Sequence, residues 1–337
     1  MSVTSVSPAP APASTRKVAT LGQREERLAY LLVAPSLLIV FLIVIFPFIW
    51  NIWLAFKPVQ LRDLATANLW NPSDLTLDNF ERVFRGVTIF PLSEFDLGRF
   101  GTLLSTTLIY TFGSTFLTLL MGLAAALLAR DAFPGRQLFR GTVLFPYIAP
   151  VVAVAFIWRM MLNAQFGVIN ELGANWFSMP RTDFLTQRFA DVSLFGLDMR
   201  WPLALTVVIL FEGWRNFPFA FLFFLARLQA LSPELYEAAA VDGAAPSQRL
   251  WYITLPQLQG VIGTMLLLRF IWTFNKFDDI FLLTGGAAGT EVIIVRVVNL
   301  LFGEFRIGAA AALALVLALV LAGFMALYFR YVAAKEE

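Results

Sequence analysis

Charged side chains are rare in the apolar parts of this sequence, and one group of them interrupts two apolar stretches in its second half. These residues are Glu212, Arg215, Arg269, Lys276, Asp278 and Asp279. Charges are costly within apolar segments, so each is a candidate for binding a polar ligand or moving an ion. The alternative is that they pair with one another to fix the packing, as Glu212 and Arg215 could do at a spacing of three residues.

The residue types that are missing exclude several other chemistries. The chain contains no His and no Cys. Disulfides, thiol nucleophiles, Cys/His zinc sites and imidazole acid–base catalysis are therefore excluded. A membrane-bound glycosyl- or phosphotransferase would need a cluster of carboxylates or a metal site. Asp278 and Asp279 are adjacent, but neighbours on a helix do not face the same way, so the pair is weak support for an enzyme.

The composition indicates a membrane protein. Hydrophobic residues make up 59% of the 337 residues and charged residues only 14%, whereas soluble domains average about 45–50% and about 25%. The net charge of +2 does not indicate a nucleic-acid partner. A membrane-spanning helix needs about 20 mainly apolar residues, and several segments meet this condition. We therefore predict an all-α membrane protein with six transmembrane helices, at about residues 29–50, 101–129, 141–162, 201–226, 260–283 and 307–329.

Both ends of the chain are expected in the cytoplasm. Residues 1–28 form a predicted tail that is rich in Pro, Ala and Ser and is expected to be disordered. Residues 29–50 could instead be a signal peptide, but they are longer than the usual core of about 7–15 residues, so we expect a retained anchor. An even number of spans places residues 330–337 on the same side. The short loop 130–140 carries three arginines, which favours the cytoplasm for that side.

A polar segment, residues 227–259, connects the fourth and fifth spans. Ser232 can cap a helix that begins at Pro233, and Gly243 can end it. A second short helix is expected to begin at Pro246 and to end before Pro256. Connections between bundle helices usually take about 2–8 residues. We therefore interpret this longer segment as a docking surface; the alternative is a passive helical hairpin on the membrane face.

This segment contains a recognisable pattern. It has Glu-Ala-Ala at 237–239, Asp-Gly-Ala at 242–244, Ile253 and Leu255-Pro256. The pattern resembles the EAA signature (E-A-A-x-x-D-G-A, then I-x-L-P) of permease subunits in binding-protein-dependent ABC importers, although Leu250 stands where an aromatic residue is frequent. "FGVINELG", "FDDIFLLTGGAAGTE" and "IGAAAA" extend the similarity over about residues 29–329. The most similar subfamily is the maltose/multiple-sugar/glycerol-phosphate group with the type I importer permease fold.

The resemblance implies a coupling role for the polar loop. In that family the loop seats on a separate ATPase subunit, and the matching residues here are Glu237, Ala238, Ala239, Asp242, Gly243, Ala244, Leu255 and Pro256. The chain has no G-x-x-x-x-G-K-[ST] motif, so ATP and Mg are expected on the partner ATPase, with no cofactor or metal bound here and no enzymatic activity. The implied partners are a second homologous permease, two ATPase subunits and an extracytoplasmic substrate-binding protein, in a bacterial inner membrane.

The resemblance also implies a substrate path through the third, fourth and fifth spans. Aligning on "FPYIAP", "WRNFPF" and "RFIWTFNKFDD", it places there Tyr147, Glu212, Asn216, Phe219, Trp272, Thr273 and Lys276. Carboxylate and amide groups can bind the hydroxyl groups of a sugar, and aromatic faces can stack on its ring. The implied function is ATP-driven import of a sugar, such as an oligosaccharide.

Two other functions remain open at this point. Glycerol 3-phosphate or a glycerophosphodiester would use Arg215, Arg269 and Lys276 as cations, but this alternative leaves Glu212 unexplained. A stand-alone secondary transporter could use Glu212 or Asp278 as an ion relay. It would give no reason for the polar loop.

Overall fold

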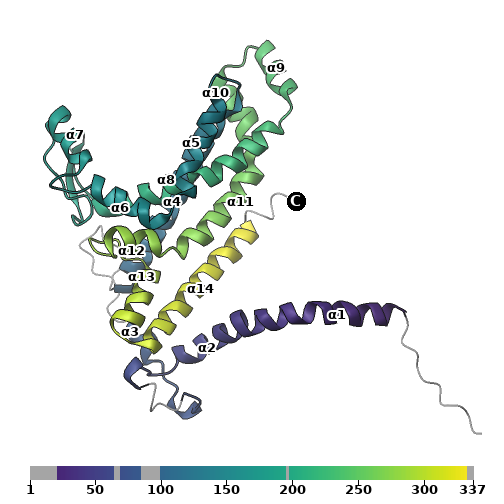
Figure 1. The fold of residues 1–337 in the computed structure, drawn as a ribbon, viewed down its shortest axis with the longest axis vertical. Coiled ribbons are helices and arrows are strands. Elements are labelled where there is room, and N and C mark those ends of the chain that lie inside the picture. Colours follow the sequence, from purple (N-terminus) through teal and green to yellow (C-terminus); the bar gives the residue numbers. More distant parts are fainter. Residues whose placement is uncertain (1–20, 64–68, 85–98, 195–196, 332–337) are drawn as a thin grey trace, which may run out of the picture. The chain divides into compact units, whose positions relative to one another are not determined.

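The structure, a computed structural model, describes residues 21–63, 69–84, 99–194 and 197–331 (Figure 1). The predicted disorder of the N-terminal tail and most of the predicted C-terminal tail lie outside these residues. The chain divides into two compact units, Met1–Asn51 and Ile52–Glu337. Each unit is described separately below.

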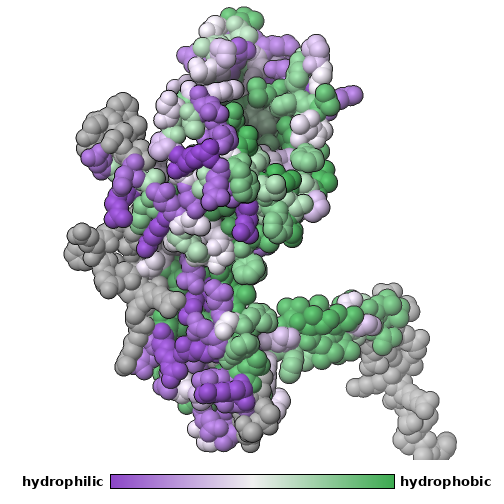
Figure 2. All heavy atoms as spheres, turned by 60° about the vertical axis from the view of Figure 1, so that its left-hand side comes forward, coloured by the Kyte–Doolittle hydropathy of each residue, from purple (hydrophilic) through white to green (hydrophobic). Residues whose placement is uncertain are grey.

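The first unit contains one long apolar helix. It consists of α1 (Leu21–Val40), a wider π-helical turn at Phe41–Ile45, and α2 (Phe46–Ala55), which continues into the second unit. The π turn lies just before Pro47, where the amide of Phe46 bonds to the carbonyl of Phe41. A wider turn at this point relieves the clash that a proline makes with the carbonyl four residues before it. Apolar side chains cover most of this helix in Figure 2, as expected of a span in contact with lipid.

The described part of the second unit is a bundle of helices with a small β-hairpin. The hairpin pairs β1 (Ala190–Leu194) with β2 (Leu197–Trp201) in antiparallel register. The longer helices are α4 (Arg99–Arg130), α5 (Arg136–Ile148), α6 (Val151–Met161), α7 (Val168–Phe177), α8 (Leu203–Gln229), α11 (Leu255–Phe274) and α14 (Ile307–Tyr331). The shorter ones are α3 (Asp78–Phe84), α9 (Pro233–Val241), α10 (Pro246–Arg249), α12 (Asp278–Thr284) and α13 (Ile293–Val298).

Helices α4 and α8 run parallel and form the centre of this bundle. Small residues allow their backbones to approach closely. A Cβ atom added to Gly122 on α4 would lie 2.6 Å from the Cβ of Ala220 on α8, and one added to Gly213 on α8 would lie 2.5 Å from Leu117. The apolar core around this contact includes the fully buried Phe221. Any larger residue at the two glycines would push the helices apart.

The predicted fold class is confirmed, since the chain is mainly helical and rich in candidate spans. Within the described residues, five helices are long and apolar enough to cross a membrane, or up to six if the bent pair α5 and α6 forms one span. The pair bends by 95°, at Ala149 and Pro150, because the residue before a proline adopts an extended backbone. The predicted segment 260–283 also divides into two helices, because α11 ends at Phe274 and α12 begins at Asp278.

Candidate functional site

The polar segment predicted to dock on a partner folds as a helical hairpin, α9 and α10 (residues 233–249). Ser232 and Pro233 take the predicted positions before and at the start of α9, although the Ser232 side chain makes no capping hydrogen bond. Gly243 has a φ of 76°, the left-handed conformation in which glycine is favoured. The amides of Gly243 and Ala244 bond to the carbonyls of Ala240 and Ala239. These bonds close the Schellman motif that ends a helix.

The exposed face of the hairpin carries the signature residues. Glu237, Ala238, Asp242 and Gly243 are exposed, while Ala239 and Ala244 are half-buried. Large apolar side chains lie exposed in and beside the hairpin, and they were not singled out from the sequence. They are Val241 (88% exposed), Trp251 (66%) and Tyr252 (80%). The sequence offers one signal for two of them, because the aromatic residues Trp251 and Tyr252 are adjacent and follow a polar helix.

Specific contacts attach this hairpin to the bundle. The guanidinium of Arg130, at the end of α4, lies 3.7 Å from the ring centroid of Tyr236 on α9. The hydroxyl of Tyr236 lies 3.0 Å from Oγ1 of Thr254, just before α11. Arg227, near the end of α8, donates to the carbonyl of Gln257 on α11 at 3.2 Å and so joins the two helices that flank the hairpin in the sequence. A displacement of the hairpin would therefore act directly on the end of α4 and on the start of α11.

The three arginines of loop 130–140 also have a structural role. Arg136 donates to the carbonyls of Ala129 and Arg130, each at 2.9 Å, and Arg140 donates to that of Ala129 at 3.0 Å. These carbonyls belong to the last turn of α4. The carbonyl groups of a last turn have no hydrogen-bond donors within their own helix. Cations at a helix C-terminus are also favoured by the helix dipole.

The exit from the hairpin differs from the prediction. The second helix was expected to end before Pro256, but the chain stays helical from Pro246 to Phe274, through a π turn at Leu250–Thr254. The amide of Leu255 bonds to the carbonyl of Leu250 across this turn. Pro256 follows directly after this wider turn, which accommodates the missing N–H of the proline and relieves its clash with the preceding turn. The hairpin and α11 are thus joined without a flexible linker.

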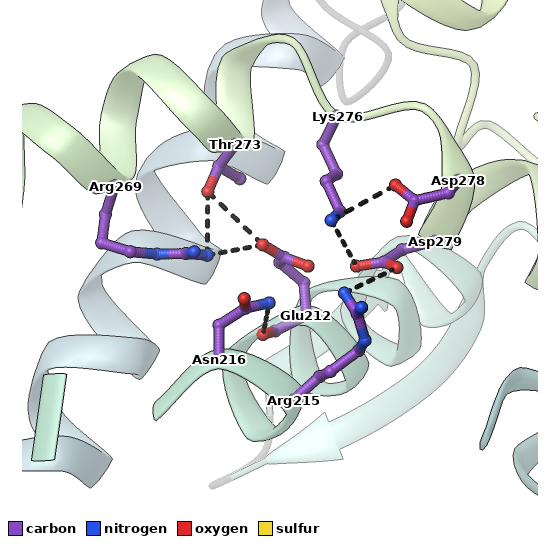
Figure 3. A network of polar contacts seen from close by, with 8 residues as sticks. All are labelled: Glu212, Arg215, Asn216, Arg269, Thr273, Lys276, Asp278 and Asp279. Carbon is purple, nitrogen blue, oxygen red and sulfur yellow. Dashed lines mark hydrogen bonds and ion pairs between the residues drawn. The ribbon is translucent and has the colours of Figure 1, made fainter. Parts of the chain in front are cut away.

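The charged residues of the apolar segments form one network across α8, α11 and α12 (Figure 3). Arg269 Nη2 lies 2.5 Å from Glu212 Oε1, and the two side chains are 3% and 1% exposed. Thr273 accepts a hydrogen bond from Arg269 at 3.1 Å. The pairing of Glu212 with Arg215, considered from the sequence, was wrong, since Arg215 Nη1 pairs with Asp279 Oδ1 at 3.5 Å.

Lys276 completes the network. Its Nζ lies 3.3 Å from Asp278 Oδ1 and 4.0 Å from Asp279 Oδ2. Within the described residues, each of the three cations Arg215, Arg269 and Lys276 therefore has a carboxylate partner. Three cations and three carboxylates leave the network formally neutral.

The structure divides the seven predicted substrate-path residues into two groups. Tyr147, Phe219 and Trp272, from three different helices, form a half-exposed aromatic cluster, in which Phe219 lies 6.0 Å from Tyr147 and 5.3 Å from Trp272, centroid to centroid. In contrast, Glu212, Asn216 and Thr273 are buried. Lys276, 21% exposed at its side chain, is also paired. A contact of these residues with substrate stays a prediction.

The comparisons with known proteins agree with the helical architecture. Residues 118–335 match the family described as "Binding-protein-dependent transport system inner membrane component". The inner membrane ABC transporter permease protein YcjO of Escherichia coli is 32% identical over 313 residues, 89% of this chain and 92% of the relative. The trehalose/maltose transport system permease protein MalF of Thermococcus litoralis is 30% identical over 303 residues, 87% of this chain and 90% of the relative.

A solved structure shows the same fold. It is a bacterial ABC transporter involved in the import of the acidic polysaccharide alginate, and one of its chains superposes with a TM-score of 0.70 at 23% identity, covering 92% of this chain and 97% of that chain. The family match and the two relatives extend over most of the chain. The chain therefore belongs to the family of binding-protein-dependent transport system inner membrane components, and it is a permease subunit of an ABC transporter.

Proposed function

We propose that this chain is the permease subunit of an ATP-driven importer of a neutral sugar, and that it forms half of the translocation channel. The observation that carries the coupling part is the α9–α10 hairpin. Its signature residues Glu237 and Asp242 are exposed and available to a partner, while Tyr236 joins the hairpin to Arg130 at the end of α4 and to Thr254 just before α11. A surface that is exposed on one side and firmly attached on the other is suited to transmit movement.

The other subunits of the importer are separate chains in this proposal. Two ATPase subunits bind ATP and Mg and receive the hairpin, a second homologous permease completes the channel, and a binding protein delivers the substrate from outside. Another solved alginate transporter, matched at a TM-score of 0.72, was crystallised with a periplasmic protein bound to an alginate pentasaccharide. Both termini of this chain then lie in the cytoplasm, with the hairpin on the same side.

The substrate class rests on relatives and on the charged network. Relatives include trehalose/maltose and galactooligosaccharide transport permeases. The alternative, glycerol 3-phosphate or a glycerophosphodiester, would need a free cation in the path. Arg215, Arg269 and Lys276 each have a carboxylate partner among the described residues. This arrangement favours a neutral substrate bound through hydroxyl groups and the cluster of Tyr147, Phe219 and Trp272.

The test is a charge reversal on the hairpin. The full complex is reconstituted with its binding protein, and sugar uptake and sugar-stimulated ATP hydrolysis are compared for Glu237→Lys and a matched control, Glu234→Lys, which reverses a charge in the first turn of the same helix. A charge-assisted hydrogen bond contributes about 1.5–3 kcal/mol. We therefore expect Glu237→Lys to weaken binding of the ATPase about tenfold or more, and uptake and stimulated hydrolysis to fall together.

The control defines the outcome that contradicts this function. Glu234→Lys should retain both activities, because residue 234 lies outside the signature. If Glu237→Lys also transports normally, the hairpin is a passive connection. Uptake that continues without any ATPase subunit would support a secondary transporter instead.

A further inference from the structure

A cavity lies at the end of the bundle opposite the α9–α10 hairpin. Its volume is about 630 Å³, within the range of about 300–1,000 Å³ that is usual for small-molecule sites. Its walls come from the end of α6 and the turn that follows, the loop 183–186, and the last turn of α12. Leu185 of this loop packs against an apolar cluster that includes Leu205 and Val208 at the start of α8, whereas the hairpin follows the end of α8 at Gln229.

Hydrogen bonds hold two of the cavity walls in place. The buried side chain of Asn170 donates to the carbonyls of Asn163 and Thr182, at 3.0 and 2.9 Å, and accepts from the amide of Thr182 at 2.8 Å. It therefore ties the turn after α6 to the segment that leads into Asp183. Oδ1 of Asn163 accepts from the amide of Gln165 at 2.8 Å. Such a site is formed before a ligand arrives.

The third wall is the end of α12. Gly285 ends this helix with a φ of 65°, and its amide bonds to the carbonyls of Ile280 and Phe281. The side chain of Thr284 accepts from the amide of Gly286 and contacts Thr290. The same short helix carries Asp279 of the charged network at its start, so one element links the cavity to that network.

The polar groups that line the cavity include both donors and an acceptor. Among the described residues, the contact found for the Arg159 guanidinium is a long one, 3.5 Å, to the carbonyl of Leu282. In the part of the chain that the structure describes, no partner is found for the side-chain amide of Gln165 or for Nδ2 of Asn163. Asp183 provides the acceptor, and a hydrogen bond from the Thr186 hydroxyl lowers the pKa of this carboxyl, so it is ionised at neutral pH.

An aromatic ring completes the lining. Phe281 lines the cavity, is 47% exposed, and is supported from behind by Phe277 at 4.8 Å between centroids. Planar amide, guanidinium and carboxylate groups bind neighbouring hydroxyls, and an aromatic face suits the apolar face of a pyranose ring. The lining holds one cation, Arg159, and one carboxylate, Asp183, so its formal charge is zero and does not favour an anion.

From these features we infer that the cavity is a second saccharide subsite, which holds one or two neutral pyranose rings at the outer mouth before they enter the path between the helices. This inference rests on the proposed function. In this subsite, hydroxyl groups of the sugar bind to Gln165, Arg159 and Asp183, and one sugar ring stacks on Phe281.

The experiment measures direct binding to the assembled permease–ATPase complex in nanodiscs, without the binding protein. Saturation-transfer NMR is recorded with trehalose and maltose as neutral probes and glycerol 3-phosphate as the anionic probe. The variants are Gln165→Ala and Phe281→Leu, and the matched control is Asn175→Ala, which removes an exposed amide on α7 outside the cavity. Assembly of each variant is checked by size-exclusion chromatography.

We expect a neutral probe to give a signal that falls about fivefold in Gln165→Ala, the loss of one neutral hydrogen bond, and at least as much in Phe281→Leu. The control should match the parent protein. Equal signals in the parent and both variants, or preferred binding of glycerol 3-phosphate, would overturn the inference. So would a loss of affinity for the binding protein with sugar binding intact, because the cavity would then be a protein-docking surface.

Uptake measurements distinguish failure of the proposed function from failure of the subsite alone. If the complete importer takes up no neutral sugar, both the function and the subsite are refuted. If sugar uptake continues and neither cavity variant changes its KM or the NMR signal, only the subsite is refuted.

Discussion

Replacing Glu212 by Gln should destabilise the assembled permease more than replacing its partner Arg269 by Met. In the native protein the two charges lie 2.5 Å apart, at 1% and 3% exposure, in the middle of the helical bundle. Glu212→Gln leaves a guanidinium without its partner, and a guanidinium cannot lose its proton in a protein. Arg269→Met leaves a carboxyl group, which can take up a proton and so avoid an isolated charge.

The size of the destabilisation depends on two effects, the uncompensated buried charge and the lost hydrogen bond between the helices. Removing one partner of a buried ion pair costs about 3–5 kcal/mol, whereas a hydrogen bond between helices in a membrane contributes about 0.6 kcal/mol on average. The uncompensated charge should therefore dominate over the lost bond. The double variant Glu212→Gln/Arg269→Met removes both charges and leaves the network neutral, so it should lie close to the parent protein. Replacing a buried pair by uncharged residues is often neutral or stabilising.

The assay is the thermal unfolding of the purified complex, together with sugar uptake. The expected order of melting temperature is Glu212→Gln lowest, then Arg269→Met, with the double variant near the parent protein. Arg62→Met is the control, because this side chain is 77% exposed and pairs with Asp63 at 3.4 Å outside the network, so its loss should cost about 1 kcal/mol or less. If Glu212→Gln melts like the parent while uptake collapses, this reasoning is refuted and Glu212 acts on the substrate.

Three further predictions concern close packing and the hairpin. Gly122→Ala should lower the melting temperature, because its Cβ would lie 2.6 Å from the Cβ of Ala220, whereas Gly323→Ala, with no atom within 4 Å, should be neutral or stabilise by up to about 1 kcal/mol. Gly243→Val should reduce sugar-stimulated ATP hydrolysis, since a φ of 76° costs a branched residue about 1–2 kcal/mol; Gly243→Asn should retain it. Tyr236→Leu should lower the uptake per ATP hydrolysed, because it removes the contact with the cation at 3.7 Å, worth about 0.5–1 kcal/mol; equal ratios in Tyr236→Leu and Tyr236→Phe would contradict a coupling role for the ring.

Features that depend on local rules were predictable from the sequence. The apolar segments follow from composition and length alone. The start of α9 at Pro233 and its end at Gly243 were both predicted and both confirmed, because the missing N–H of proline and the left-handed freedom of glycine act within a few residues. The signature residues of the hairpin were found for the same reason, since they lie within one short segment.

Features that depend on distant residues were not predictable in this way. Glu212 has a possible partner three residues away, Arg215, but the structure pairs it with Arg269, 57 residues along the chain. The path from α10 into α11 was expected to break at Pro256, and a π turn absorbs the strain instead. Local spacing cannot decide between such alternatives, because the favoured one depends on which helices pack together.

The sequence by itself determined the class of the protein: an all-α chain with apolar spans, without His or Cys chemistry, and with a polar hairpin of recognisable pattern. Only the tertiary structure decided how the buried charges pair, which aromatic residues gather on one surface, and that Asn163, Asp183 and Phe281 line one cavity. The physical reason is that helix start and stop signals and the lengths of apolar segments are properties of consecutive residues. Ion pairing and cavity formation depend instead on contacts between helices that are far apart in the chain.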